Sequence, residues 1–420
     1  MMCLKSDMET KNQVLHKTDM ENLFQVKSER AAFTSSISKV CMSLLAVLIF
    51  VSATVSATTT NTMINVGNWS NGANWSLGHE PTNSEDVIIP SDGVATIDVS
   101  AVCASLTIGD NSTSAIVTIS GTNSLTITTA GGGSGNLYIN GANSNSLFQF
   151  NINGGSVNVM GQVIPGGFNG GEINVTSGSV RFSNTSSLTW GEAVNLNVTG
   201  TGSATFDGQL DLTTVSAGST TFSLTGNGSF VFNGLVNQTS SSCTISNTGT
   251  AGTIRFNAGY SISGGSFVTM AGENIYFASS FTNSGSALTL NATSNSYFSS
   301  TTTVTPTSLI TFGNVIINSA VDLTLNGDIN VAKNWTNNGG NLIAGSSTVG
   351  FVGTSAQAIN GTSVSQTFNN ISLSLTAGQA LSVAGSTTSL TVNNLSMTTG
   401  NFTAGTAATV NINGDLSIAS

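Results

Sequence analysis

Apolar and polar residues alternate in short units along most of the chain. From about residue 101 onward, units such as LTIG at 106–109 and VNVMG at 157–161 place an apolar side chain at every second position and stop at Gly or Asn. A period of two predicts a short strand, and the Gly or Asn after it predicts a turn. No helical pattern separates these units, which indicates an all-β sandwich, barrel, propeller or solenoid.

Internal repetition favours the solenoid. Residues 334–335 match residues 394–395 at a shift of 60, and residues 312–316 resemble residues 368–372 at a shift of 56. We therefore predict a superperiod of three coils of roughly 20 residues each. The predicted fold class of residues 101–420 is all-β, a right-handed parallel β-helix or β-solenoid. Because the repeat pattern runs to the end without a cap, we expect these 420 residues to be a fragment of a longer protein.

The composition agrees with polar, solvent-exposed sheets. Only 7% of the residues are charged, 39% are hydrophobic and 47 are glycine, whereas about a quarter of the residues in an average globular protein are charged. Ser, Thr and Asn must therefore cover the surface, and β-branched Thr, Val and Ile favour strands. Such a texture is also compatible with disorder, but the regularly spaced Val, Ile, Leu and Phe indicate a packed core.

An apolar block near the N-terminus predicts export. Residues 40–51 (VCMSLLAVLIFV) follow Lys39 and precede a run of small residues. This is the pattern of a secretory signal peptide, with cleavage after Ala57 or Ala53, so we assign residues 1–57 to a leader. A retained membrane anchor is the alternative, although the block is short for a membrane span.

Residues 58–100 differ from the repeats that follow them. They contain Trp69, Trp75, two prolines and a cluster of acidic residues. An open solenoid end exposes unpaired strand edges and apolar side chains. We therefore predict that residues 58–100 form an N-terminal head that caps this end.

Charge is distributed unevenly along the chain. After residue 57 there are fourteen acidic residues and three basic ones, Arg181, Arg255 and Lys333, which give a formal net charge of −11. Binding to phosphate groups requires a basic stripe, which is missing. Nucleic acid is therefore not a predicted partner.

Carboxylates are the candidates for the chemistry of polysaccharide lyases and hydrolases, which use acids on one face with a base nearby. The candidates are Asp207, Asp211, Asp322 and Asp328, and only Asp328 has a base close in sequence, Lys333. We interpret the four as turn and edge residues that keep the solenoid soluble. No catalytic residue and no enzymatic activity are predicted.

His79 is the single histidine after residue 57, and it lies beside Glu80, Glu85 and Asp86. This segment is either a metal-binding loop or a solvated turn. One histidine with distant cysteines lacks the spacing of a zinc site. We therefore favour the turn and predict no metal and no cofactor.

The candidate ligand-binding or capping aromatics are Trp69, Trp75, Trp190 and Trp335. An exposed indole ring can stack on a sugar, whereas a buried one fills a core or caps an end, which is the commoner use. Phe230 and Phe232 are two positions apart, so they share one strand face and are predicted to point inward. Cys103 and Cys243 are 140 positions apart, and we expect them to be small buried side chains rather than a disulfide.

Two segments resemble a known group of proteins. GNW at 67–69, NW at 74–75, Gly78, Pro81 and DVIIP at 86–90 are similar to the Trp-rich opening of large surface proteins of Gram-negative bacteria that export by the type IX route. VGF at 349–351, QAING at 357–361 and TFNNI at 367–371 resemble the adhesin-like β-solenoid repeats of those proteins. The resemblance covers residues 61–98 and 310–420, while the middle matches only in texture.

This resemblance implies a secreted or surface-tethered adhesin-like protein that ends in a C-terminal sorting domain. The repeat texture of residues 101–420 departs from that pattern, because no sorting domain follows it, and two-partner or autotransporter secretion is the alternative export route. We expect a stalk or adhesin without catalysis or cofactor, secreted or on the outer surface of a Gram-negative bacterium. Its expected partners are surface glycans or other extracellular polymers and the secretion machinery.

The alternative function is a carbohydrate-active or carbohydrate-binding β-helix. Binding would be indicated by Trp190 or Trp335 exposed on a flat sheet, and catalysis by aspartates converging on one face beside a cleft.

Overall fold

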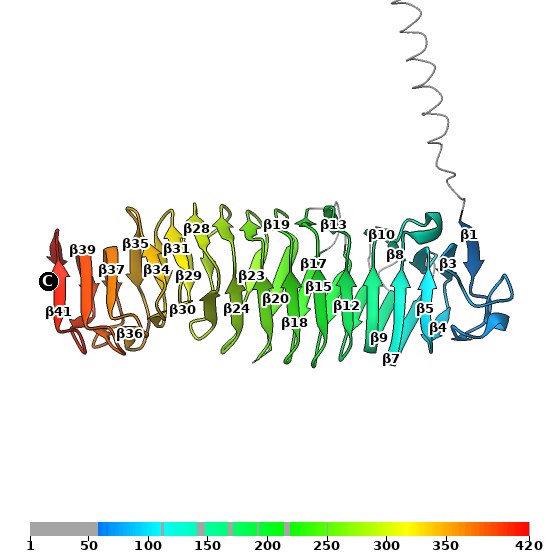
Figure 1. Cartoon of the computed structure of the whole chain (residues 1–420), viewed down its shortest axis with the longest axis horizontal. Helices are drawn as coiled ribbons and strands as arrows, with labels where there is room; N and C mark the ends of the chain where they lie inside the picture. Colours follow the sequence, from blue (N-terminus) through cyan, green and yellow to red (C-terminus); the bar gives the residue numbers. More distant parts are fainter. Residues whose placement is uncertain are drawn as a thin grey trace, which may run out of the picture. The chain divides into compact units, whose positions relative to one another are not determined.

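The computed structural model describes residues 58–419 except 111–112, 141–147, 167–170, 191–192, 214–218 and 250. The predicted leader and signal peptide, residues 1–57, lie outside the described residues. The described chain has 55% strand and about 15 turns of a parallel β-solenoid (Figure 1). The prediction of an all-β solenoid is therefore confirmed. Its helical segments are two short 3-10 turns, η1 (Gly72–Asn74) and η2 (Ala130–Gly132), and no described helix has the length and hydropathy of a membrane span.

Stacked parallel strands form ladders along the solenoid, and the described pairings are parallel apart from one antiparallel bridge between Met63 and Trp75. An N-terminal sheet contains β1 (Thr59–Thr62), β3 (Glu85–Ile89), β6 (Ser105–Ile108), β8 (Leu137–Asn140) and β10 (Val163–Gly166). Ladder A contains β2 (Gly67–Asn68), β4 (Val94–Ile97), β7 (Ala115–Ile127), β9 (Phe148–Val159), β11 (Glu172–Val175), β14 (Asn195–Val198), β17 (Thr220–Leu224), β20 (Cys243–Asn247) and β23 (Ser266–Val268).

Ladder B is the longest and shares β7 and β9 with ladder A, because these two strands are long enough to pair in both. Its other strands are β5 (Ser100–Cys103), β12 (Ser179–Phe182), β15 (Ser203–Phe206), β18 (Ser229–Phe232), β21 (Thr253–Phe256), β24 (Asn274–Phe277), β27 (Asn295–Phe298), β30 (Asn314–Ile317), β33 (Trp335–Asn337), β36 (Gln357–Asn360), β38 (Ala380–Val383) and β40 (Asn401–Thr403).

Two further ladders complete the coils. Ladder C contains β13 (Leu188–Trp190), β16 (Leu210–Leu212), β19 (Val236–Gln238), β22 (Tyr260–Ile262), β25 (Ser280–Asn283), β28 (Thr302–Pro306), β31 (Asp322–Leu325) and β34 (Asn341–Ile343). Ladder D contains β26 (Leu288–Thr289), β29 (Ile310–Phe312), β32 (Ile329–Val331), β35 (Thr348–Phe351), β37 (Ser365–Ser374), β39 (Ser389–Thr399), β41 (Thr409–Ile412) and β42 (Leu416–Ile418).

The coils do not have the regular length that the sequence repeats suggested. Asn295 pairs with Asn314, 19 positions later, whereas Ala115 pairs with Phe148, 33 positions later. The shift of 60 residues also relates different ladders, because Trp335 lies in β33 of ladder B and Leu395 in β39 of ladder D. The predicted superperiod of three 20-residue coils is therefore wrong. The resemblance that suggested it comes from similar strand-turn units on different faces.

The core follows directly from the period of two. In β18, Phe230 and Phe232 are fully buried, as predicted, while Val231 between them faces outward and is partly exposed. Parallel register stacks the inward rings of successive coils, so that Phe232 lies between Phe206 and Phe256 with ring centroids 5.1 and 5.2 Å apart. Such columns bury large aromatic area and stabilise each coil through its two neighbours.

The segment predicted to be a head is hydrogen-bonded to the coils that follow it. Strand β3 pairs with β6, and β4 pairs with β7, so residues 58–100 supply the first strands of the N-terminal sheet and of ladder A. Trp69 and Trp75 are buried and pack edge to face with ring centroids 4.9 Å apart. The Trp75 Nε1–H donates to the Trp69 carbonyl at 2.7 Å, which fixes the loop between β2 and β3.

Candidate functional site

A groove of about 720 Å³ lies over β7, β9, β12 and β15, which follow one another along ladder B (Figure 1). Outward side chains of successive coils line it in two columns. Ser124, Ser156 and Ser179 are in register in the first column. Because neighbouring parallel strands are about 4.8 Å apart, the groove presents one hydroxyl per coil at a regular spacing along the solenoid axis.

The second column of the groove contains Thr126, Asn158 and Arg181 in register. The Asn158 side-chain oxygen is buried and has no hydrogen-bond partner. An unsatisfied buried acceptor costs about 1–3 kcal/mol. The floor of the groove thus contains an acceptor that the protein itself leaves unpaired.

Arg181 and Asp207 form an ion pair at one side of the groove. The distance from Arg181 Nε to Asp207 Oδ2 is 2.7 Å, and the arginine side chain is 62% exposed while the aspartate side chain is 13% exposed. Asn233 donates to the other aspartate oxygen at 3.0 Å, and Asn257 donates to Asn233 at 2.8 Å. The carboxylate is therefore held from two sides, and the guanidinium extends into solvent.

This pair corrects one inference from the sequence. Asp207 was expected to have no base nearby, but Arg181 lies 26 positions earlier, which is one coil. The missing signal was the coil length, because β12 and β15 pair with Ser179 opposite Ser203. Lys333, which is close to Asp328 in sequence, donates instead to the Ser355 hydroxyl at 2.7 Å.

The outward column that contains Arg181 continues along ladder B into an aromatic segment. The Arg255 guanidinium carbon lies 4.1 Å from the centroid of the Tyr276 ring. Tyr276 stacks on Tyr297 with centroids 4.7 Å apart and planes at 11°. Burial, and to a lesser degree the neighbouring Tyr276, raises the pKa of Tyr297. Both tyrosines are partly exposed, and sequence reasoning that searched for tryptophans missed them.

The other aspartates make separate hydrogen bonds. Asp211 lies in β16 on ladder C and accepts hydrogen bonds from Ser187, Gln209 and Asn237. Burial acts to raise its pKa, but these hydrogen bonds together outweigh burial and lower the pKa below its ordinary value. An ionised carboxylate bound in this way is a structural acceptor and is poorly suited to donate a proton.

Asp322 and Asp328 are used in the same structural manner. Asp322 accepts from the Asn341 amide at 3.3 Å, and Asp328 accepts from the Thr348 backbone N–H at 2.7 Å. Each bond joins one coil to the next. In the described part of the chain, no three His, Cys, Asp or Glu side chains converge as metal ligands would.

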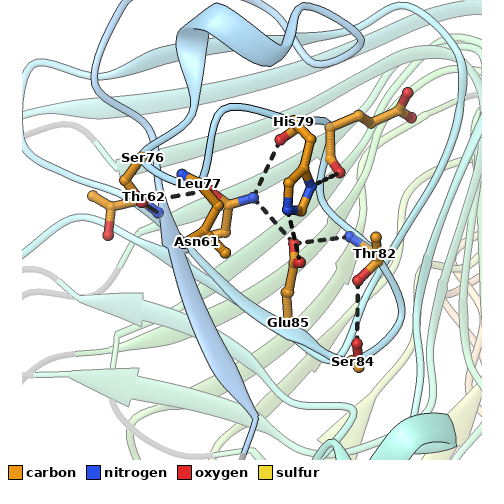
Figure 2. Close-up of polar contacts among 9 residues, drawn as sticks. Asn61, Thr62, Ser76, Leu77, His79, Thr82, Ser84 and Glu85 are labelled. Carbon is orange, nitrogen blue, oxygen red and sulfur yellow. Dashed lines mark hydrogen bonds and ion pairs between the residues drawn. The ribbon is translucent and has the colours of Figure 1, made fainter.

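The segment around His79 is a hydrogen-bonded loop at the N-terminal end of the solenoid (Figure 2). Glu85 is buried and accepts from Asn61 Nδ2 at 3.0 Å and from the Thr82 backbone N–H at 3.1 Å. His79 Nε2 lies 3.6 Å from Glu85 Oε1, and His79 Nδ1 lies 2.9 Å from the carbonyl oxygen of Glu80. Both ring nitrogens therefore face oxygens, and neither is directed at a serine hydroxyl.

Asp86, the other acid near His79, is directed elsewhere. Its carboxylate accepts from the Ser105 hydroxyl at 2.5 Å and from the Thr58 hydroxyl. The acids of this loop thus fasten β1 and β6 to β3. The arrangement matches the turn that we favoured from the sequence.

The four tryptophans, Trp69, Trp75, Trp190 and Trp335, are all buried, with at most 1% of their surface exposed. Trp190 packs between Phe182 and Phe222, and its Nε1–H donates to the Val194 carbonyl at 3.0 Å. Trp335 packs against Phe368. A sugar-stacking role would require an exposed ring face, which none of the four has, so the structure places them in the core.

Cys103 and Cys243 are buried and are not bonded to each other. Burial raises the pKa of both thiols. A buried thiol of raised pKa is a poor nucleophile. The expectation that they are small buried side chains is confirmed.

Comparison of the sequence with family models and curated proteins, and of the structure with solved structures, gives no match.

Proposed function

We propose that this protein is a secreted or cell-surface β-solenoid with a structural or adhesive role and no catalytic activity. The observation that carries the proposal is the continuous stack of about 15 parallel coils, in which large side chains face inward and Ser, Thr and Asn face outward. A stack of this kind produces length and flat polar faces. Such faces suit contact with an extended surface or polymer.

The proposed location rests on the sequence. Residues 40–51 have the pattern of a signal peptide, and residues 61–98 and 310–420 resemble type IX-exported surface proteins of Gram-negative bacteria. The proposed partners are surface glycans or other extracellular polymers, together with the secretion machinery. Nucleic acid is not proposed, because three basic residues after residue 57 provide no stripe for phosphate.

The absence of catalysis is proposed from the bonds of the acidic residues. Asp211, Asp322 and Asp328 each accept hydrogen bonds that join neighbouring coils. A general acid would instead need a carboxyl that retains a proton near neutral pH and faces a cleft. Asp207 borders the groove, but its ion pair with Arg181 and its bond from Asn233 favour the ionised form.

A second candidate function is carbohydrate binding without cleavage. It is favoured by the groove over β7, β9, β12 and β15, with its regular hydroxyl and amide groups. In this reading the ligand-binding residues are polar outward side chains of ladder B rather than the tryptophans.

Cell fractionation and a binding assay test the proposal together. The N-terminus of the mature chain would be sequenced from cells that produce it, and we expect it to begin at residue 54 or 58 in the surface or secreted fraction. The purified chain would be incubated with immobilised glycans and bacterial surfaces, and soluble sugar would be measured in the same wells. Binding without sugar release is the expected result. Sugar release that is lost in D207N and D211N variants would make the protein an enzyme.

A further inference from the structure

Two of the three basic residues after residue 57 lie in a single outward column of ladder B. We call it the arginine column, and its members in register are Arg181, Thr205, Val231, Arg255, Tyr276 and Tyr297. The column begins inside the groove at Arg181 and ends at the stacked tyrosines. The two arginines are thus separated by two intervening strands, or about 14 Å at the usual strand spacing.

We propose that the groove and the arginine column bind a neutral, linear polysaccharide whose chain lies along the solenoid axis. This inference deepens the proposed adhesive function by assigning a face and a ligand class. It does not depend on the export route.

The direction of the ligand follows from the arrangement of the donors and acceptors. Ser156 and Ser179 repeat in one column and Asn158 and Arg181 in the next, each pair one coil apart. A polymer that repeats its own hydroxyl groups can meet such columns only if it runs parallel to the axis. The Asn158 oxygen, which has no partner within the protein, would accept a hydrogen bond from a ligand hydroxyl.

The neutrality of the ligand follows from charge. Arg181 is already paired with Asp207 at 2.7 Å, so this part of the groove has little net charge. The chain after residue 57 carries a formal net charge of −11, and a field of that sign repels polyanions. An arginine with an adjacent carboxylate offers both donors and acceptors, which matches sugar hydroxyls that are themselves donors and acceptors.

The far end of the column contributes polar contacts rather than ring faces. The Arg255 guanidinium and the Tyr297 ring lie against Tyr276, and Tyr276 and Tyr297 stack almost parallel. The stacked rings cover each other, so their edges remain for contact with a ligand. We therefore assign recognition at this end to guanidinium and phenol groups, and not to stacking of a sugar on an aromatic face.

The test is binding of the full chain to a panel of immobilised neutral glucans, mannans and galactans and of uronate-containing polysaccharides. The variants are Arg181→Gln, which removes the exposed guanidinium, and Ser156→Tyr, which fills the groove from an exposed position. Lys333→Gln is the matched control, because it removes the third basic residue outside the column. Circular dichroism and thermal melting check that each variant folds as the wild type does.

We expect at least one neutral linear glycan to bind, with affinity reduced at least tenfold in R181Q and in S156Y and unchanged in K333Q. Two results would overturn the inference: binding that R181Q and S156Y leave intact, or binding confined to uronate polymers and abolished by salt. Adhesion that persists in both variants would reject this face while keeping the proposed function. No binding of the wild-type chain to any glycan or cell surface would reject both.

Discussion

Glu273 is a buried carboxyl group whose protonation should control the stability of the central coils. It precedes β24, is fully buried, and neither of its carboxyl oxygens has a hydrogen-bond partner. Its carbonyl accepts from the Asn295 N–H, which places it between successive coils. Burial raises its pKa from 4.5 to about 8, and the nearby Met270 N–H opposes this shift without forming a hydrogen bond of good geometry.

The sign of the effect follows from this difference in pKa. The folded chain keeps the proton on Glu273 up to about pH 8, whereas the unfolded chain releases it above its ordinary value of 4.5. The free energy of unfolding should therefore be highest below pH 4.5 with respect to this group and should fall as the pH rises through 8. One pKa unit corresponds to about 1.4 kcal/mol, so the loss is on the order of 3 kcal/mol at pH 7 and 5 kcal/mol above pH 8.

The substitution that tests this is Glu273→Gln, which keeps the size of the side chain and cannot ionise. Urea unfolding would be followed by circular dichroism at pH 5, 7 and 9 for the wild type, E273Q and D322N. Asp322→Asn is the control because that carboxylate is exposed on β31. We expect E273Q to match the wild type at pH 5, to exceed it at pH 9, and to lose most of the pH dependence. An unchanged pH dependence in E273Q would refute the reasoning.

Three further predictions concern the core and the N-terminal end. Phe232→Ala should lower the free energy of unfolding by about 3–5 kcal/mol because it opens a cavity in the phenylalanine column, whereas Val231→Ala on the outer face should have a much smaller effect in the same urea titration. Trp75→Phe should cost about 1–3 kcal/mol in thermal or urea unfolding, because the buried Trp69 carbonyl loses its donor; a smaller loss would mean that water replaces the indole. Native Cys103 should resist iodoacetamide, as detected by mass spectrometry, and react only after unfolding, since burial raises the pKa of its thiol. Rapid labelling of the native chain would contradict its burial.

The strand-turn units were predictable because they depend on local chemistry. In the segment 229–234, alternation alone assigned Phe230 and Phe232 to the inside and the following Asn and Gly to a turn, and the structure agrees. The parallel solenoid also followed, because only stacked coils allow so many short strands with so few charged residues. The length of each coil did not follow, because the turns vary in length, and hydrogen-bond register decides which strands stack.

The candidate site was predictable only in part. The four tryptophans were recognised as the large aromatic residues, but the choice between a ligand platform and a core position depends on which strand face they occupy. The tyrosines Tyr276 and Tyr297 were not singled out. They become a pair only because β24 and β27 stack in register.

The sequence by itself determined what alternation and composition control: all-β structure, inward Phe, Val, Ile and Leu, and polar outward faces. Only the tertiary structure decided which residues meet across coils. Arg181 lies beside Asp207 at a separation of 26 residues, while Asn295 lies beside Asn314 at a separation of 19. The physical reason is that parallel pairing joins strands through their backbones whatever the length of the turns between them. The spacing of a solenoid's surface groups is therefore uniform in space although it is irregular along the chain.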